Sequence, residues 1–148
     1  MSVSGRRRRR SDDLGAALLS KAAWEVLRGQ LVLRCGGRCE ASGAPLVDGR
    51  WAVHHRDSRG MGGTRRDGIN ALSNLLALSE VAHVWVHGHP GRARELGWIC
   101  VSSDVPLETS VSTPVVLYSG RRVLLDPGWP GYLDAPGAPY DLGPHPFR

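Results

Sequence analysis

Four histidines and one asparagine are the residues of this sequence whose types and spacing are best suited to chemistry. His54 and His55 are adjacent, Asn74 follows, and His83 and His87 lie four positions apart. Side chains four positions apart project from the same face of a helix, so His83 and His87 can bind one metal ion together. A further histidine that titrates near neutral pH can draw a proton from water. The pattern therefore predicts a metal site that performs hydrolysis.

Three short elements must position these side chains. Residues 51–54 read as a strand that ends in the histidine pair, and residues 75–78 read as a second strand. Ser79 can cap a helix over residues 80–87, which Gly88 then ends. The glycine-rich and arginine-rich segment between the two strands is long for a loop in a compact domain, which is typical of a functional loop.

The rest of the chain predicts an α+β protein. The sequence favours a helix from Ser11 or Asp12 to Gly29, a short strand at 31–33 and a short helix at 92–96. Beyond Trp98, short β-like runs interrupted by proline and serine include Val101, Val105, Val111, 115–117 and 123–125. The domain is expected to span residues 12–126, between a basic tail at 1–11 and an irregular Pro/Gly-rich tail at 127–148.

The order of strand, loop, strand and histidine-bearing helix resembles the HNH endonuclease family, and most closely the HNH proteins encoded by bacteriophages. The doubled histidine followed by His-x-x-x-His is also similar to the nuclease domains of DNase colicins. The family's ββα-metal (His-Me finger) fold is therefore expected at about residues 50–98. The segments that carry the resemblance are Val53-His54-His55-Arg56, Arg59-Gly60-Met61-Gly62-Gly63, Ser73-Asn74-Leu75-Leu76-Ala77-Leu78 and His83-Val84-Trp85-Val86-His87.

The resemblance implies a separate role for each of the five residues. His55 is the general base that activates water, and Asn74 fixes the loop and helps to orient His55. His54 is a metal ligand at a position where many family members have aspartate. His83 and His87 are the ligands on the helix.

These residue types also suit phosphodiester hydrolysis without reference to the family. The reaction needs a nucleophile, neutralisation of charge on the phosphate and help for the leaving oxygen, and one divalent ion can serve the last two needs. Arginines in and beside the loop are expected to contact the nucleic-acid backbone, which makes binding sensitive to salt. These arginines are Arg56, Arg59, Arg65 and Arg66.

The expected cofactor is one divalent ion. Three neutral imidazole ligands make Mn, Ni, Zn or Co plausible beside Mg, which prefers oxygen ligands. The structural zinc of many HNH proteins needs two Cys-x-x-Cys pairs, whereas Cys35 and Cys39 form only Cys-x-x-x-Cys. We therefore expect Cys35, Cys39 and Cys100 to be reduced and to pack as small apolar side chains.

Charge and composition favour a nucleic-acid partner. The 148-residue chain has a net charge of +5 and nearly all its basic residues are arginine, which binds phosphate well. The sequence shows no secretory signal and no apolar run long enough for a membrane, so a cytoplasmic protein is expected. If the chain is encoded by a phage, that cytoplasm is the host's, and the resemblance suggests genome packaging with terminase, or mobility.

The sequence thus predicts an enzyme that hydrolyses DNA phosphodiester bonds, by nicking or by double-strand cleavage. One alternative is a catalytically idle DNA-binding or scaffold module with the same fold, against which the presence of His55 argues. Another is a metal-dependent hydrolase of RNA or of a small phosphoester.

Overall fold

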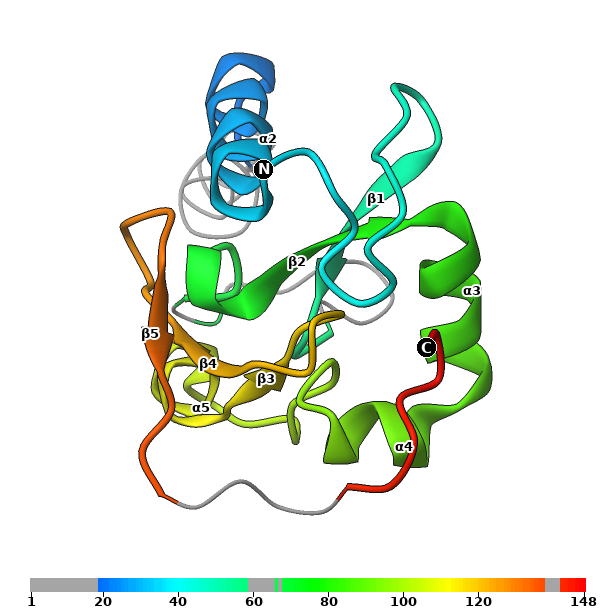
Figure 1. Ribbon diagram of the computed structural model, residues 1–148. Helices are drawn as coiled ribbons and strands as arrows, with labels where there is room; N and C mark the ends of the chain where they lie inside the picture. Colours follow the sequence, from blue (N-terminus) through cyan, green and yellow to red (C-terminus); the bar gives the residue numbers. More distant parts are fainter. Residues whose placement is uncertain (1–18, 59–65, 67, 138–141) are drawn as a thin grey trace, which may run out of the picture.

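The structure is a computed structural model that describes residues 19–58, 66, 68–137 and 142–148. It is a small α+β fold, as predicted, with short helices and two antiparallel sheets (Figure 1). The first sheet pairs β1 (Trp51–His55) with β2 (Leu75–Ser79), and the second has the order β3-β4-β5. The described part of the chain contains no helix that is both long enough and apolar enough to cross a bilayer.

Helix α2 (Lys21–Cys35) differs from the prediction at its C-terminal end. Ser20 caps it by accepting a hydrogen bond from the Ala23 N–H, and the helix continues through Gly29 to Gly36, which has a φ of 65°. The strand predicted at 31–33 is therefore wrong. Leu31 is fully buried whereas Leu33 is 75% exposed, so this apolar run supplies one face of a helix that packs on β2. The predicted helix start at Ser11 or Asp12 lies outside the described residues.

The two strands and the helix that carry the histidines form as predicted. β1 and β2 are antiparallel, with Trp51 opposite Ser79 and His55 opposite Leu75. The short 3-10 helix η1 (Leu72–Asn74) leads into β2, and α3 (Glu80–Gly88) follows β2 directly. Ser79 caps α3 by accepting a hydrogen bond from the Ala82 N–H at 3.3 Å.

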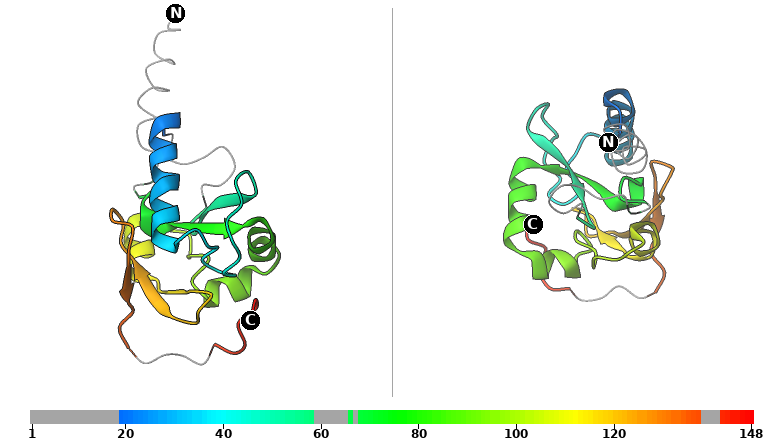
Figure 2. Two further views of the ribbon diagram at one scale, coloured as in Figure 1. Left: turned by 45° about the horizontal axis from the view of Figure 1, so that its top comes forward. Right: turned by 180° about the vertical axis from the view of Figure 1, so that it is seen from behind.

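Strand β2 lies at the centre of the hydrophobic core. Leu76 and Leu78 belong to a cluster that reaches α3, α4 (Pro90–Glu95) and the second sheet. Leu75 and Ala77, which point to the opposite face, pack with Leu31 of α2. α3 and the second sheet therefore both pack against the Leu76 and Leu78 face of β2, and α2 packs against the opposite face. Figures 1 and 2 show α3 and the second sheet at opposite sides of the molecule.

Beyond Trp98 the structure agrees with the prediction only in part. Strands β3 (Val115–Val116) and β4 (Arg122–Leu125) match two of the expected β-like runs. Val111, expected in a β-like run, lies in helix α5 (Pro106–Ser112), and Val101 and Val105 lie outside any strand. Residues 127–148 were expected to be irregular, yet β5 (Tyr132–Asp134) forms there and pairs with β4.

A buried ion pair ties α2 to the sheets. Arg34 Nε and Nη2 donate to the two carboxylate oxygens of Glu40 at 2.8 and 2.9 Å. Glu40 also accepts hydrogen bonds from the Ala77 N–H of β2 and from the Tyr132 hydroxyl of β5, at 2.8 and 2.7 Å. Three segments distant in sequence thus meet at one carboxylate: the end of α2 with the turn after it, β2 and β5. Burial of the phenol beside that carboxylate raises the pKa of Tyr132.

Candidate metal centre and catalytic cleft

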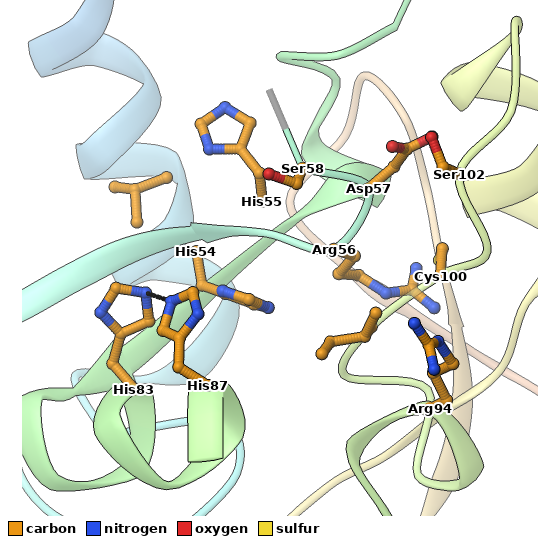
Figure 3. A pocket seen from close by; sticks show the side chains of 12 residues that line it. His54, His55, Arg56, Asp57, Ser58, His83, His87, Arg94, Cys100 and Ser102 are labelled. Carbon is orange, nitrogen blue, oxygen red and sulfur yellow. Dashed lines mark hydrogen bonds between the residues drawn. The ribbon is translucent and has the colours of Figure 1, made fainter. Parts of the chain in front are cut away.

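Three of the four histidines meet in one cluster. His54 extends from β1, while His83 and His87 lie one turn apart on α3 (Figure 3). One ring nitrogen from each residue lies within 4.8 Å of the other two, a spacing that could hold a metal ion. The Nε2 atoms of His83 and His87 are 2.9 Å apart. The structure therefore brings together the three residues that the sequence predicted as ligands.

His54 is set for metal binding by a contact with the backbone. Its Nε2 lies 2.8 Å from the carbonyl oxygen of Trp98. A carbonyl oxygen can only accept a hydrogen bond, so Nε2 carries the proton and the lone pair that could bind a metal ion is on Nδ1. Metal-bound histidines commonly donate their other N–H to such a group. Because the ring is 5% exposed, burial lowers the pKa of His54 to about 3. The ring is thus neutral at physiological pH, as a ligand must be.

The two helix histidines open the cluster to solvent. His83 is half-buried and His87 is exposed. Burial and the neighbouring His87 lower the pKa of His83, which also favours its neutral form. Three neutral imidazoles at this spacing fit a divalent transition metal, with an accessible side left for a further ligand.

His55 points away from this cluster. Adjacent residues of a strand face opposite sides, and Figure 3 shows the His55 ring on the other side of β1 from His83 and His87. His55 Nε2 lies 2.9 Å from Oδ1 of Asn70. An amide oxygen only accepts, so Nε2 carries the proton and Nδ1 has the lone pair that a base requires. The ring also lies nearly parallel to that of Trp24, with centroids 6.3 Å apart.

Asn74, which the resemblance implies fixes the loop and helps to orient His55, hydrogen-bonds to both ends of the loop. It is fully buried, and its Oδ1 accepts a hydrogen bond from the Asp57 N–H at 2.8 Å. Its Nδ2 donates to the carbonyl oxygens of Asp57 and Ile69, at 3.1 and 2.9 Å. Asn74 thus joins the start of the loop to its end, whereas Asn70 contacts the ring of His55. Asn70 was missed in the sequence because an asparagine two residues after a glycine in a loop reads as a turn residue.

Arg56 has a structural role that the sequence did not predict. It is 1% exposed, and its guanidinium donates four hydrogen bonds to backbone carbonyls. These carbonyls belong to Gly97, Ser73, Ser110 and Thr113, at distances of 2.7, 2.7, 3.1 and 2.6 Å. Burial lowers the pKa of Arg56 to about 10, so the group is still a cation at neutral pH. With its donors used in this way, Arg56 is not placed to contact a nucleic-acid backbone as predicted.

The other three predicted arginine contacts divide into two groups. Arg66 forms a bidentate ion pair with the buried carboxylate of Asp57, at 3.0 and 3.1 Å, and so stabilises the loop from within. Asp57 Oδ2 also accepts a hydrogen bond from the Ser103 N–H at 3.1 Å. Arg59 and Arg65 lie outside the described residues.

A cleft of about 480 Å³ is lined by the three clustered histidines and by His55. Its wall near the cluster is formed by His54, His83 and His87. His55, at the end of β1, also lines the cleft, although its ring lies on the other side of the strand. The far side is formed by Arg94 of α4 together with Ile99, Cys100 and Ser102. The sequence gave no reason to single out Arg94, because its place in the cleft depends on how α4 packs.

The cysteines take no part in the cluster. All three thiols are free; Cys39 and Cys100 are buried and Cys35 is half-buried, as expected of small apolar side chains. Trp98 is fully buried and belongs to the core, as predicted, and half-buried Trp85 packs against that core. His89 stacks on Trp85 with centroids 4.3 Å apart, outside the ligand cluster.

Comparison of the chain with protein-family models, with curated proteins and with solved structures gives no match. The function must therefore be argued from the arrangement of the residues themselves. That arrangement consists of a three-histidine cluster that could hold a metal ion, with a fourth histidine at the same cleft.

Proposed function

We propose that the protein is a metal-dependent endonuclease of the HNH type that hydrolyses DNA phosphodiester bonds, with β1, β2 and α3 as its ββα-metal core. The observation that carries this proposal is the position of His55. It shares a cleft with the three-histidine cluster but points to the other side of β1, with its Nε2 bonded to Asn70. A histidine that is held beside a ligand set and kept out of it suits a general base.

The residues of the chain divide the chemistry between them. His54, His83 and His87 would hold one divalent ion, which when bound supplies charge neutralisation for the phosphate and the leaving oxygen. His55 would take the proton of the attacking water at Nδ1. Asn70 would keep that ring in its orientation, and Asn74 would hold the loop that carries Asn70.

The ligand types bear on which ion is used. Three neutral nitrogen ligands leave the full charge of the ion for the phosphate, and imidazole suits Zn, Ni or Mn better than Mg. We therefore expect one divalent ion, with Mn, Ni or Zn preferred to Mg.

A polymeric substrate is supported by charge. The chain has a net charge of +5, and DNA binding that neutralises phosphates weakens as salt rises. A role beside phage packaging proteins such as terminase remains a proposal from the sequence resemblance.

The test is cleavage of supercoiled plasmid with Mg, Mn, Ni or Zn, by the parent and by His55→Ala. We expect cleavage by the parent, and a loss of at least about a hundredfold in His55→Ala, because general-base catalysis contributes on that scale. A matched control is His89→Ala, which removes a histidine outside the ligand cluster and should leave the rate nearly unchanged.

Metal binding, measured by calorimetric titration, separates the two kinds of histidine. His55→Ala should bind metal as the parent does, whereas His83→Ala or His87→Ala should bind it at least about tenfold more weakly. A parent that binds metal and DNA but cleaves under none of the four ions would instead support the idle scaffold module. A parent that cleaves only an RNA of the same sequence would move the substrate from DNA to RNA.

A further inference from the structure

Arg94 is the cleft residue whose charge the structure leaves available. It is exposed, lies on α4 and lines the same cleft as the three clustered histidines and His55. In Figure 3 its side chain extends from the opposite side of the cleft to His83 and His87. Arg94 therefore faces the space that a phosphate bound near the cluster would enter.

Two other arginines near the cleft that the structure describes, Arg56 and Arg66, are committed to contacts within the protein. The guanidinium of Arg56 donates to four carbonyls, and that of Arg66 pairs with Asp57. By contrast, no hydrogen bond or ion pair joins the guanidinium of Arg94 to any described residue. Its neighbour on the helix, Arg92, pairs with Glu95 at 2.7 Å and donates to the Pro144 carbonyl at 3.1 Å.

The backbone below Arg94 is held firmly. Ala93 and Leu96, on either side of it, are buried in the core. Gly97, just beyond α4, gives its carbonyl oxygen to Arg56 Nε at 2.7 Å. Arg56 therefore helps to set the position of the helix from which Arg94 extends, and a fixed backbone reduces the entropy that an ordered phosphate contact would cost.

The charges around the cleft favour an anion. Asp57, the carboxylate among the lining residues, is buried and neutralised by Arg66. A guanidinium can form two parallel hydrogen bonds with a phosphate, which makes arginine well suited to this contact.

We propose that Arg94 binds the non-bridging oxygens of the phosphate that is hydrolysed, from the side of the cleft opposite the histidine cluster. The assignment rests on the proposed function, in which that phosphate is bound at the histidine cluster. It makes Arg94 a residue that contacts the substrate, with Arg56 as the positioning residue behind it.

The test compares Arg94→Ala, Arg94→Lys and, as a matched control, Arg92→Ala. Protein loaded with the metal that supports cleavage, or with Zn if none does, is titrated with inorganic phosphate by calorimetry. Arg94→Ala should weaken phosphate binding at least about tenfold, as expected for the loss of hydrogen bonds to a charged group. Arg94→Lys should recover part of the affinity, because it keeps the charge without the bidentate geometry. Arg92→Ala should leave the phosphate affinity unchanged, and none of the three variants should change the affinity for the metal.

Cleavage at saturating DNA gives the second readout. Arg94→Ala should slow it at least tenfold while binding of a short duplex in EDTA changes less than about threefold. Weaker DNA binding with an unchanged rate at saturation would overturn the assignment to the reacting phosphate. Equal phosphate binding by the parent and Arg94→Ala, or none by the parent, would overturn it too. Phosphate binding that depends on Arg94 in a parent that cleaves no nucleic acid would refute the nuclease proposal and keep the Arg94 site.

Discussion

His54 and His55 are chemically identical neighbours whose rings the structure holds in different surroundings. Because they alternate across β1, one ring meets the Trp98 carbonyl and the other meets the Asn70 amide. Each contact fixes the proton on Nε2 and places the lone pair on Nδ1, the atom that would bind a metal at His54 and take a proton at His55. The tautomer that each ring needs is thus set by a partner that can only accept a hydrogen bond.

The orientation of His55 can be tested through Asn70. Replacing Asn70 with alanine removes the Oδ1 contact, so we expect the cleavage rate to fall about tenfold to a hundredfold with metal affinity unchanged. Asn70→Asp keeps an acceptor and adds a charge that stabilises the protonated imidazole, so the acidic limb of the pH–rate profile should move to higher pH. Two variants with equal loss and no such displacement would indicate that Asn70 serves only the fold.

At the scale of elements, the sequence predicts best what depends on local signals. The strand that carries His54 and His55, the Ser79 cap and the helix behind it all appear, because short apolar runs, capping and a following glycine act over a few residues. The predicted end of α2 was wrong because an apolar Leu-Val-Leu run suits either a strand or one face of a helix. Packing of Leu31 against β2 decides for the helix. No short-range pattern could supply that contact.

The contacts of Arg56 link several elements, and its replacement should show their value. Arg56→Met keeps much of the volume but leaves four buried carbonyls without a donor. We expect the free energy of unfolding, measured by urea denaturation, to fall by about 3–5 kcal/mol. The matched control is Arg121→Met, which breaks an exposed ion pair with Asp134 and should cost less than about 1 kcal/mol. Similar losses in the two variants would mean that the Arg56 contacts add little stability.

For the whole molecule, the segments beyond the histidine helix complete the site. The Trp98 carbonyl orients His54, and the Trp98 indole donates to the Val116 carbonyl of β3 at 2.9 Å. The Arg34–Glu40 pair, closed by Tyr132, joins α2 to β5 in the same way. Neither arrangement can be predicted from the sequence, because both depend on tertiary contacts between distant segments. In the sequence, a buried arginine also looks the same as a surface arginine. The structural role of Arg56 was missed for this reason.

The pH dependence of stability should report on the burial of His54. The folded protein keeps this ring neutral down to a pKa of about 3, whereas the unfolded chain takes up the proton near pH 6.5. The unfolded state therefore binds more protons between these two pH values. The contribution of His54 to the free energy of unfolding is fully present above pH 6.5 and is lost as the pH falls below it. Without metal, we expect this ring to account for about 2 kcal/mol of the loss between pH 7.5 and pH 5. His54→Gln should lose correspondingly less in urea denaturation at the two pH values, and equal losses would refute the assignment.

Ser79 is both the last residue of β2 and the cap of α3, so no linker separates the strand from the helix. One inserted residue would turn α3 by about 100° around its axis. His83 and His87 would then face away from His54, although every residue of the site would still be present. Lineages of this protein should therefore tolerate substitutions between Leu78 and His83 far better than insertions or deletions there. The number of residues between Leu78 and His83 thus sets the geometry of the histidine cluster. A frame-preserving insertion there would separate His83 and His87 from His54, whereas a substitution would leave the three together.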